Sequence, residues 1–214
     1  MSEHMALENL TVLDLTRVLA GPFCTMMLAD MGANVIKIEV PKGGDDTRSY
    51  PPFRAKNLNG ERESVYFANI NRNKKGITLN LKAPEGKEIF KELVKKADIV
   101  VENYRPGVMD KLGLGYDVLK EINPRIIYAA VSGFGCYGPY HLRPGYDILA
   151  QAMGGMMSIT GSKGGEPTRA GSALGDILGG LHVTIGILAA VNARTITGKG
   201  QRLSLIHISE PTRL

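Results

Sequence analysis

Short apolar segments alternate with helical patterns along most of the 214-residue chain, and this alternation limits the fold more than any other feature. Four segments have the pattern of strands: residues 10–15, 35–40, 98–102 and 125–132. Five segments have the pattern of helices: residues 22–31, 84–96, 117–121, 146–159 and 173–195. Strands and helices that alternate with short links build a mostly parallel sheet covered on both faces. The sequence therefore predicts an α/β fold with an open, Rossmann-like sheet.

The loops that follow the predicted strands are the expected ligand-binding segments, because ligands of such sheets lie beyond the carboxyl ends of the strands. These loops are rich in glycine, proline or charge, and they cover residues 16–22, 41–54, 103–107 and 133–145. Neither GxGxxG nor GxxxxGK[ST] occurs, so side chains would have to hold any phosphate. The candidates are Arg48, Arg72, Lys74, Lys75, Lys82, Arg105 and Lys111. Each of them, taken alone, is more often a solvated surface charge.

Asp176 interrupts the apolar segment 173–191 with a charge. A buried carboxylate costs several kcal/mol unless it is compensated. The nearby Gly175, Gly179 and Gly180 would let a backbone or a ligand approach closely, although each weakens a helix by roughly 1 kcal/mol relative to alanine. This combination is typical of a residue kept for chemistry. A carboxylate in the first turn of a helix is also favoured by the helix dipole, and the spacing does not decide between the two explanations.

The charge and the cysteine content narrow the class of protein. The net charge of +5 favours an anionic ligand, but the basic residues are scattered, so we expect no nucleic-acid partner. Cys24 and Cys136 form no CxxC pair, which indicates a reducing compartment and predicts a cytoplasmic protein. The histidines lack the paired spacing of metal ligands, so we expect no metal. The N-terminus has no basic segment followed by an apolar one, and no secretory signal is predicted.

The apolar segment 173–191 is close to the length of a membrane span, and residues 175–179 have the GxxxG spacing of a helix-dimerisation face. Asp176 and His182 interrupt the segment, and no aromatic belt flanks it. We therefore interpret it as a buried helix and expect no membrane association.

Seven stretches of the chain, in order and nearly without gaps, resemble family III CoA-transferases of the CaiB/BaiF type. They are VLDLTRVLAGP at 12–22, MGANVIKIE at 31–39, GGDDTR at 43–48, NRNKK at 71–75, VENYRPG at 101–107, GFG at 133–135 and GKGQ at 198–201. This family includes formyl-CoA:oxalate and succinyl-CoA:glutarate transferases. The resemblance covers residues 7–202 and implies the large domain of such an enzyme, with coenzyme A thioesters and small carboxylic acids as substrates.

The resemblance also implies roles for individual residues. Asp176 matches the aspartate that attacks the acyl-CoA thioester, forms a mixed anhydride and then carries CoA as an aspartyl thioester. A site that limits the solvation of this carboxylate would make it a better nucleophile, and amides near Gly175 would stabilise the oxyanion. The residues implied to contact CoA are Val18, Ala20, Leu79, Lys82, Asn103, Tyr104, Arg105 and Lys111. Val40 stands where many members carry a basic residue, which puts that phosphate contact in doubt.

Other functions stay open at the level of the sequence. The similar alpha-methylacyl-CoA racemases have a catalytic histidine where this chain has Tyr146, and a neutral tyrosine does not readily replace it, so a transferase is favoured. The sequences at 43–48 (GGDDTR) and 71–75 (NRNKK) resemble those of transferases that use dicarboxylates, which favours a dicarboxylic acceptor. The remaining alternatives are a module that binds CoA without catalysis and a purely structural or interaction protein.

The two ends of the chain differ from the family pattern. Residues 1–6 have the character of a leader or tag, and residues 7–202 are predicted to be a partial large domain. Residues 203–213, LSLIHISEPTR, match the translation of a transposase sequencing adapter, so we predict that residues 203–214 are not native. The family resemblance implies a further small domain and an interlocked homodimer. We therefore expect this chain to expose apolar surface and to have little transferase activity by itself.

Overall fold

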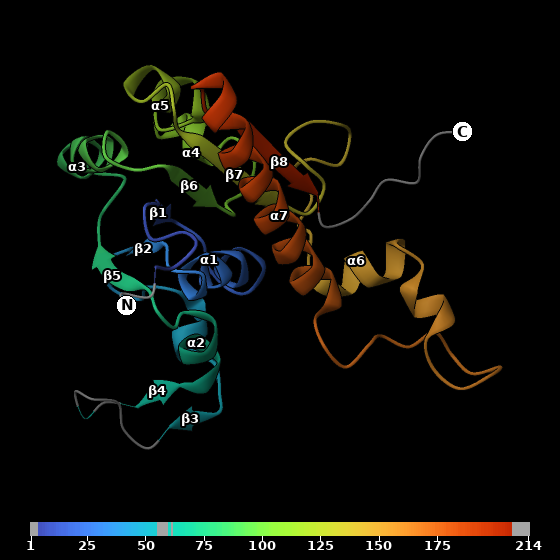
Figure 1. The fold of residues 1–214 in the computed structure, drawn as a ribbon. Coiled ribbons are helices and arrows are strands. Elements are labelled where there is room, and N and C mark those ends of the chain that lie inside the picture. The colour runs from blue at the N-terminus through green and yellow to red at the C-terminus, as the bar shows by residue number, and fades with distance from the viewer. Residues whose placement is uncertain (1–3, 55–59, 61, 207–214) are drawn as a thin grey trace.

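The computed structural model describes residues 4–54, 60 and 62–206, and its centre is a six-stranded sheet (Figure 1). The strands of this sheet are β1 (Thr11–Asp14), β2 (Asn34–Glu39), β5 (Lys75–Thr78), β6 (Ile99–Glu102), β7 (Ile127–Ser132) and β8 (Arg202–Ile206). They lie in the order β5-β2-β1-β6-β7-β8, and every neighbouring pair is parallel. A separate antiparallel pair, β3 (Phe53–Arg54) and β4 (Glu63–Ser64), lies below the sheet in Figure 1.

Helices cover both faces of the sheet. One face packs against α1 (Ala20–Asp30) and α7 (Leu174–Thr197), and the other packs against α3 (Pro84–Val94), α4 (Val108–Lys111) and α5 (Tyr116–Ile122). The shorter helices are η1 (Asp46–Ser49), α2 (Val65–Ile70), α6 (Asp147–Met153) and η2 (Met156–Ile159). Adjacent residues of β1 show why both faces need a cover, because Val12 and Leu13 point to opposite faces and both are buried. The α/β fold with an open parallel sheet, predicted from the sequence, is therefore confirmed.

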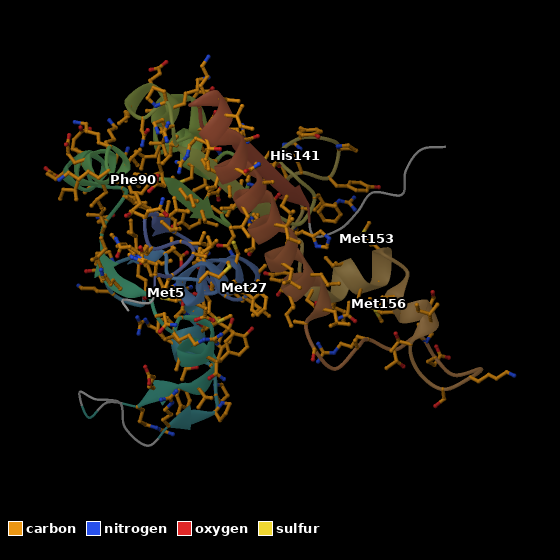
Figure 2. All side chains as sticks on the ribbon, viewed as in Figure 1. Met5, Met27, Phe90, His141, Met153 and Met156 are labelled. Carbon is orange, nitrogen blue, oxygen red and sulfur yellow. The ribbon has the colours of Figure 1, made fainter. Side chains whose placement is uncertain are left out.

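The two hydrophobic cores lie on opposite faces of the sheet. The first contains Cys24 and Leu28 of α1 together with Val183 and Ile187 of α7. The second is centred on α3, whose Phe90 is fully buried and is labelled in Figure 2. The helix α6 and the loop that follows it extend away from both cores, and Met153 and Met156 mark this arm in Figure 2.

The direction of the chain reverses at β1. From β1 the chain continues to β2 and β5 on one side, and it then returns to β6, β7 and β8 on the other side. A reversal of this kind leaves a crevice at the carboxyl ends of the two central strands, because the loops after them turn in opposite directions. In this protein those loops follow β1 and β6.

Some elements differ from the sequence-based prediction. Residues 146–159 were expected to form one helix, but α6 ends at Met153 and η2 begins at Met156. Gly155 between them has a φ of 80°, which no helical residue adopts, so the helix stops. The strand β5 was not predicted, because its four residues are all exposed at the sheet edge and show no apolar alternation.

The helix α7 is long and apolar enough to cross a membrane by length and composition alone. In this structure it packs on the sheet and against α1, with Val183, Thr184 and Ile187 among its buried residues. The strand β8, which follows it, pairs with β7 over Tyr128–Ser132 and includes the first residues of the segment predicted to come from an adapter. The rest of that segment, 207–214, lies outside the described residues, as do residues 1–3, so the predicted origin of both ends stays a prediction.

Candidate active site

A pocket of about 220 Å³ lies in the crevice between the ends of β1 and β6. The segments that follow β1, β6 and β7 form its wall together with the first turn of α7. The lining residues are Arg17, Val18, Leu19, Ala20, Asn103, Tyr104, Arg105, Pro106, Val131, Ser132, Gly133, Arg143, Pro144, Gly145, Tyr146 and Asp176. The position agrees with the rule that ligands of open parallel sheets bind where the strand order reverses.

The pocket brings together several residues that the sequence singled out. Asp176 lies in the same wall as the predicted CoA contacts Val18, Ala20, Asn103, Tyr104 and Arg105. Their role in CoA binding stays a prediction, but they share one cavity although they come from three separate parts of the chain.

Three other predicted CoA contacts lie outside this pocket. Leu79 follows β5, and its backbone N–H donates to the carbonyl of Glu39 at 2.9 Å. Lys82 precedes α3, Lys111 ends α4, and both are exposed. A second, smaller pocket of about 50 Å³ lies between the ends of β1 and β2 and shares Arg17 and Tyr104 with the main pocket.

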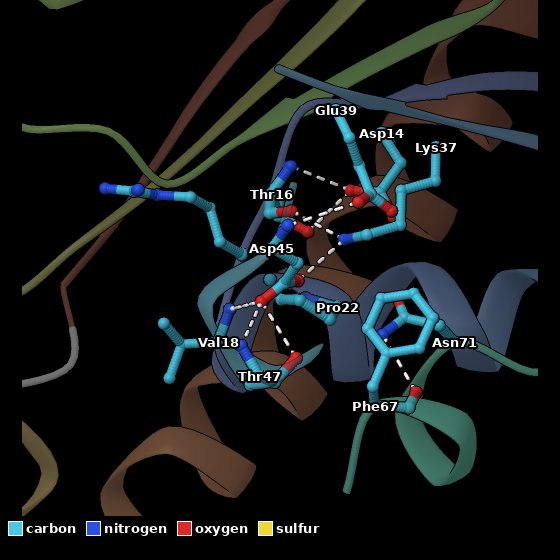
Figure 3. Close-up of polar contacts among 12 residues, drawn as sticks. Asp14, Thr16, Val18, Pro22, Lys37, Glu39, Asp45, Thr47, Phe67 and Asn71 are labelled. Atoms are coloured by element: carbon cyan, nitrogen blue, oxygen red, sulfur yellow. Dashed lines mark hydrogen bonds and ion pairs between the residues drawn. The ribbon is translucent and has the colours of Figure 1, made fainter. Parts of the chain in front are cut away.

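The loop after β1 is held in place by residues distant in sequence. Asn103 accepts a hydrogen bond from the Arg17 N–H at 2.9 Å and donates one to the Arg17 carbonyl at 2.7 Å. Asp45 accepts from the Val18 N–H at 3.2 Å, and Val18 has a φ of 69° (Figure 3). A β-branched residue in this left-handed region is strained, so these hydrogen bonds must compensate the strain.

A buried network of charges supports this loop (Figure 3). Lys37 Nζ donates to the Thr16 carbonyl at 2.8 Å and to Asp45 at 2.9 Å, and Lys74 Nζ donates to Asp14 at 3.0 Å. Burial raises the pKa of Asp14, but the charges of Lys74 and Lys37 and the hydrogen bonds from Thr16 and Thr25 together outweigh burial and hold the pKa of this carboxyl below its usual value. The network therefore ties the end of β1 to the loop after β2.

Several basic residues considered as phosphate ligands are instead engaged within the protein. Lys74 belongs to the buried network, Arg48 makes two hydrogen bonds to Glu39 at 2.7 and 2.8 Å, and Arg72 pairs with Asp30. Lys75 donates to the Asn34 side chain at 2.7 Å. These four side chains are thus engaged with other residues of the chain, and Lys75 among them by one exposed hydrogen bond.

Asp176 is the third residue of α7 and is partly buried at the wall of the main pocket. Burial, followed by the nearby charge of Asp147, raises the pKa of Asp176 to about 6. Asp176 in turn affects Tyr66 on α2, because burial and, after it, the charge of Asp176 raise the pKa of Tyr66 to about 12. A carboxylate that is partly shielded from water and still ionised near neutral pH is suited to nucleophilic attack.

The pocket also contains residues that were not identified from the sequence. Arg17 and Arg143 line it with Arg105, which gives the wall three guanidinium groups. The Arg143 guanidinium stacks 4.1 Å from the ring of Tyr140. Gly133 and Gly145 are in close backbone contact, and a Cβ on either would overlap the other. The sequence signal was present in the Gly-rich loop 133–145, but spacing alone does not show that its two ends meet.

The hydroxyl of Ser132 is buried and has no hydrogen-bond partner among the residues that the structure describes. It ends β7 beside Gly133 in the pocket wall. Within the described ranges, no group of three or more His, Cys, Asp or Glu side chains is arranged to hold a metal ion.

The sequence of this chain matches a known protein family and is similar to characterised members of it. Residues 7–210 match the family described as CoA-transferase family III. The chain is 50% identical over 195 residues to the succinyl-CoA:glutarate CoA-transferase of Mus musculus, covering 91% of this chain and 43% of that protein. It is 49% identical over 199 residues to the acetyl-CoA:oxalate CoA-transferase of Acetobacter aceti, covering 92% of this chain and 50% of that protein.

The crystal structure of a CAIB/BAIF family protein from Brucella suis is similar in fold, with a TM-score of 0.92 and 45% sequence identity. That match covers 96% of this chain and 54% of the other. The chain therefore spans about half the length of the relatives that it matches.

Proposed function

Because the chain belongs to CoA-transferase family III, we propose that it takes part in CoA transfer from an acyl-CoA to a carboxylic acid, with Asp176 as the nucleophile. The observation that carries this proposal is the place of Asp176. Its carboxylate lies in the wall of a pocket at the strand-order reversal, together with three arginines. Asp176 is partly buried, as expected for a carboxylate that must react rather than remain fully hydrated.

The charges of the pocket support an anionic substrate. Arg17, Arg105 and Arg143 line the same cavity as Asp176, and guanidinium groups bind carboxylates and phosphates well. The smaller pocket continues from Arg17 and Tyr104 towards Val40, on the side of the sheet where Leu79 lies. We propose that the extended CoA molecule follows this path with its thioester at Asp176.

The reaction proceeds through three covalent states of Asp176. A carboxylate oxygen attacks the thioester carbonyl, the C–S bond breaks, and CoA leaves as a thiolate while a mixed anhydride forms. The thiolate then attacks the Asp176 carbonyl, which releases the original acyl group as a carboxylate and leaves CoA on Asp176 as a thioester. The acceptor carboxylate then attacks the aspartyl thioester, the C–S bond breaks, and a second mixed anhydride forms between Asp176 and the acceptor while CoA leaves as a thiolate. This thiolate attacks the acceptor carbonyl, which gives the new acyl-CoA and releases Asp176 as a carboxylate.

The ionisation of Asp176 fits this sequence. With a pKa of about 6, the side chain is mostly ionised at pH 7 and attacks as a carboxylate. The raised pKa also means a more basic and therefore more nucleophilic oxygen than that of an exposed aspartate.

We propose a dicarboxylic acid as the acceptor. Two relatives are named for oxalate and glutarate, and both acids keep one free carboxylate after the other has become a thioester. Arg143 is a suitable partner for that carboxylate, because it lines the pocket with Asp176 and its guanidinium is held by stacking on Tyr140. Tyr146, also in the pocket, offers no imidazole for proton transfer at an alpha carbon.

The decisive experiment is the capture of the first covalent state in this 214-residue chain, a single step that is measured apart from the complete transfer cycle, of which we expect little. The chain is mixed with succinyl-CoA and the released CoA thiol is measured before any hydroxylamine is added. Hydroxylamine is then used to convert the covalent state on the protein, which is digested for mass spectrometry. We expect release of CoA thiol and a modification on the peptide that contains Asp176, and neither in Asp176→Asn. Glu166→Gln, which removes an exposed carboxylate from a nearby loop, is the matched control and should behave as the wild type. Equal thiol release from the wild type and Asp176→Asn would overturn the proposal.

A further inference from the structure

We propose that Asp147 is a positioning residue for Asp176: it ties the first turn of α7 to α6 and places a second negative charge beside the reacting carboxylate. This inference rests on the proposed function of Asp176. It concerns a contact between two helices whose partners are 28 residues apart in sequence.

The first step is the hydrogen bond that Asp147 makes to the start of α7. Asp147 Oδ1 accepts from the Gly175 backbone N–H at 2.8 Å, one residue before Asp176. The N-cap residue of α7, Ala173, makes no side-chain capping bond. A helix needs acceptors for its first N–H groups, and here the acceptor comes from a neighbouring helix. Asp147 therefore determines where α7 begins relative to α6.

The second step is the fixation of Asp147 itself. Its Oδ2 accepts from Gln151 Nε2 at 2.7 Å, one turn further along α6. Gln151 is only 2% exposed, its Oε1 accepts from the Ala170 N–H at 2.8 Å, and its Nε2 also donates to the Ser172 carbonyl at 3.2 Å. Both carboxylate oxygens of Asp147 are thus engaged, and the chain segment that leads into α7 is bound to the same helix.

The third step is the close packing of the two helices at this contact. A Cβ at Gly175 would lie 2.7 Å from the Cβ of Ala150 and 3.2 Å from Oδ1 of Asp147. Any side chain at Gly175 would therefore push α7 away from α6 and lengthen the hydrogen bond. The close approach of α6 therefore explains the glycine before Asp176.

The fourth step is electrostatic. The titratable and charged groups that bear on Asp176 include Asp147 on α6 and Tyr66 on α2, and Arg17, Arg105 and Arg143 line the same pocket wall. Burial contributes most to the raised pKa of Asp176, and the charge of Asp147 adds to it. Asp147 therefore has two effects on Asp176, one through geometry and one through charge, and different substitutions separate them.

The test compares three variants of the 214-residue chain. Asp147→Asn keeps an oxygen for the Gly175 N–H and removes the charge. Asp147→Ala removes both the acceptor oxygen and the charge. Gln151→Ala keeps the charge of Asp147 and removes the hydrogen bond that Gln151 donates to it. Two quantities are measured: the pKa of Asp176, by carboxyl ¹³C NMR with Asp176→Asn for assignment, and the hydrogen-exchange rate of the Gly175 amide.

We expect Asp147→Asn to lower the pKa of Asp176 by about 1 unit, because a like charge is removed while burial remains. Exchange of the Gly175 amide should stay within about threefold of the wild type in Asp147→Asn and rise at least tenfold in Asp147→Ala. Gln151→Ala should leave the pKa of Asp176 raised. If Asp147 had only a structural role, its loss would change the exchange of the Gly175 amide, but Asp147→Asn would leave the pKa of Asp176 unchanged.

Two results would overturn the inference: an unchanged pKa of Asp176 in Asp147→Asn, or unchanged exchange of the Gly175 amide in Asp147→Ala. Both measurements are made without substrate, so they do not depend on the proposed reaction. If the hydroxylamine experiment fails while these shifts appear, the function of Asp176 is wrong and the role of Asp147 stands. A variant that does not fold is recognised by its NMR spectrum, and the other two variants then decide.

Discussion

Glu102 shows how one buried side chain can make the stability of the protein depend on pH. It ends β6 with only 7% of its surface exposed, just below the pocket wall. Its carboxylate accepts from the Tyr104 N–H at 2.7 Å and from the Tyr128 hydroxyl at 3.2 Å. Burial raises the pKa of Glu102 to about 7 in spite of these two hydrogen bonds, which lower it. Glu102 thus supports the loop that carries Asn103 and Tyr104 and titrates near neutral pH.

The sign of the resulting effect follows from the raised pKa. The folded state favours the protonated form of Glu102. The stability that Glu102 contributes is therefore complete below about pH 4.5 and is lost as the pH rises through about 7. Glu102→Gln keeps an acceptor for Tyr104 and cannot ionise. We expect the difference in unfolding free energy between pH 5 and pH 8 to shrink by on the order of 2–3 kcal/mol in this variant.

Urea unfolding at the two pH values measures this difference. Glu121→Gln, an exposed residue of α5, is the control and should leave the pH dependence unchanged. The same pH dependence in Glu102→Gln as in the wild type would show that Glu102 does not carry the effect.

At the scale of elements, the buried ion pairs join β1, β2 and the segment before β5. Lys74 has a side chain that is 2% exposed, and its Nζ contacts Asp14 at 3.0 Å, the Pro22 carbonyl at 3.0 Å and Asn71 at 2.9 Å. These contacts fix the start of α1 against the strand that precedes it. The loop between β1 and α1, which carries Val18, is therefore held by contacts with the network and not by hydrogen bonds within the loop alone.

Removal of one partner of such a pair leaves the other charge buried. We expect Lys74→Met to lower the free energy of unfolding by about 3–5 kcal/mol, because Asp14 remains fully buried without its main counter-ion. The neighbouring Lys75→Met is the control, since its side chain is exposed, and it should change stability by about 0.5 kcal/mol or less. Denaturant unfolding of both variants decides, and a similar stability for the two would contradict the role given to Lys74.

At the scale of the whole molecule, apolar side chains remain exposed on α6, α7 and the segment next to them. They are Ile148, Leu149, Met153, Ile159, Leu178, Ile185 and Ile196. Ile185 and Ile196 are 62% and 82% exposed on the face of α7 that does not meet the sheet. Apolar surface of this kind favours association, because each buried side chain gains a few kcal/mol.

We therefore expect this chain to associate in a concentration-dependent manner. Sedimentation velocity over a hundredfold range of concentration measures the association. Ile185→Lys combined with Ile196→Lys should shift the distribution towards the monomer, whereas Val118→Lys on α5, at the opposite face of the sheet, should not. Association of the α7 variant equal to that of the wild type would place the contact elsewhere.

The secondary structure was largely predictable from the sequence, and particular residues show why. The apolar pattern of residues 98–102 predicted β6, and Pro84 at the first position of α3 marked the start of that helix. Such signals act over a few residues, so they are visible without the fold. The exposed edge strand β5 and the break at Gly155 were missed, because an edge strand needs no apolar pattern and a single glycine is also tolerated within helices.

The amino-acid sequence alone determined the α/β class, the place of Asp176 in the first turn of a long apolar helix, and the family. The tertiary structure decided which residues surround that carboxylate. Val18 meets Asp45 across 27 residues, Gly175 meets Asp147 across 28, and Lys74 meets Asp14 across 60. Helix and strand signals are local, whereas these contacts exist only because the strand order reverses at β1 and brings distant loops to one edge of the sheet.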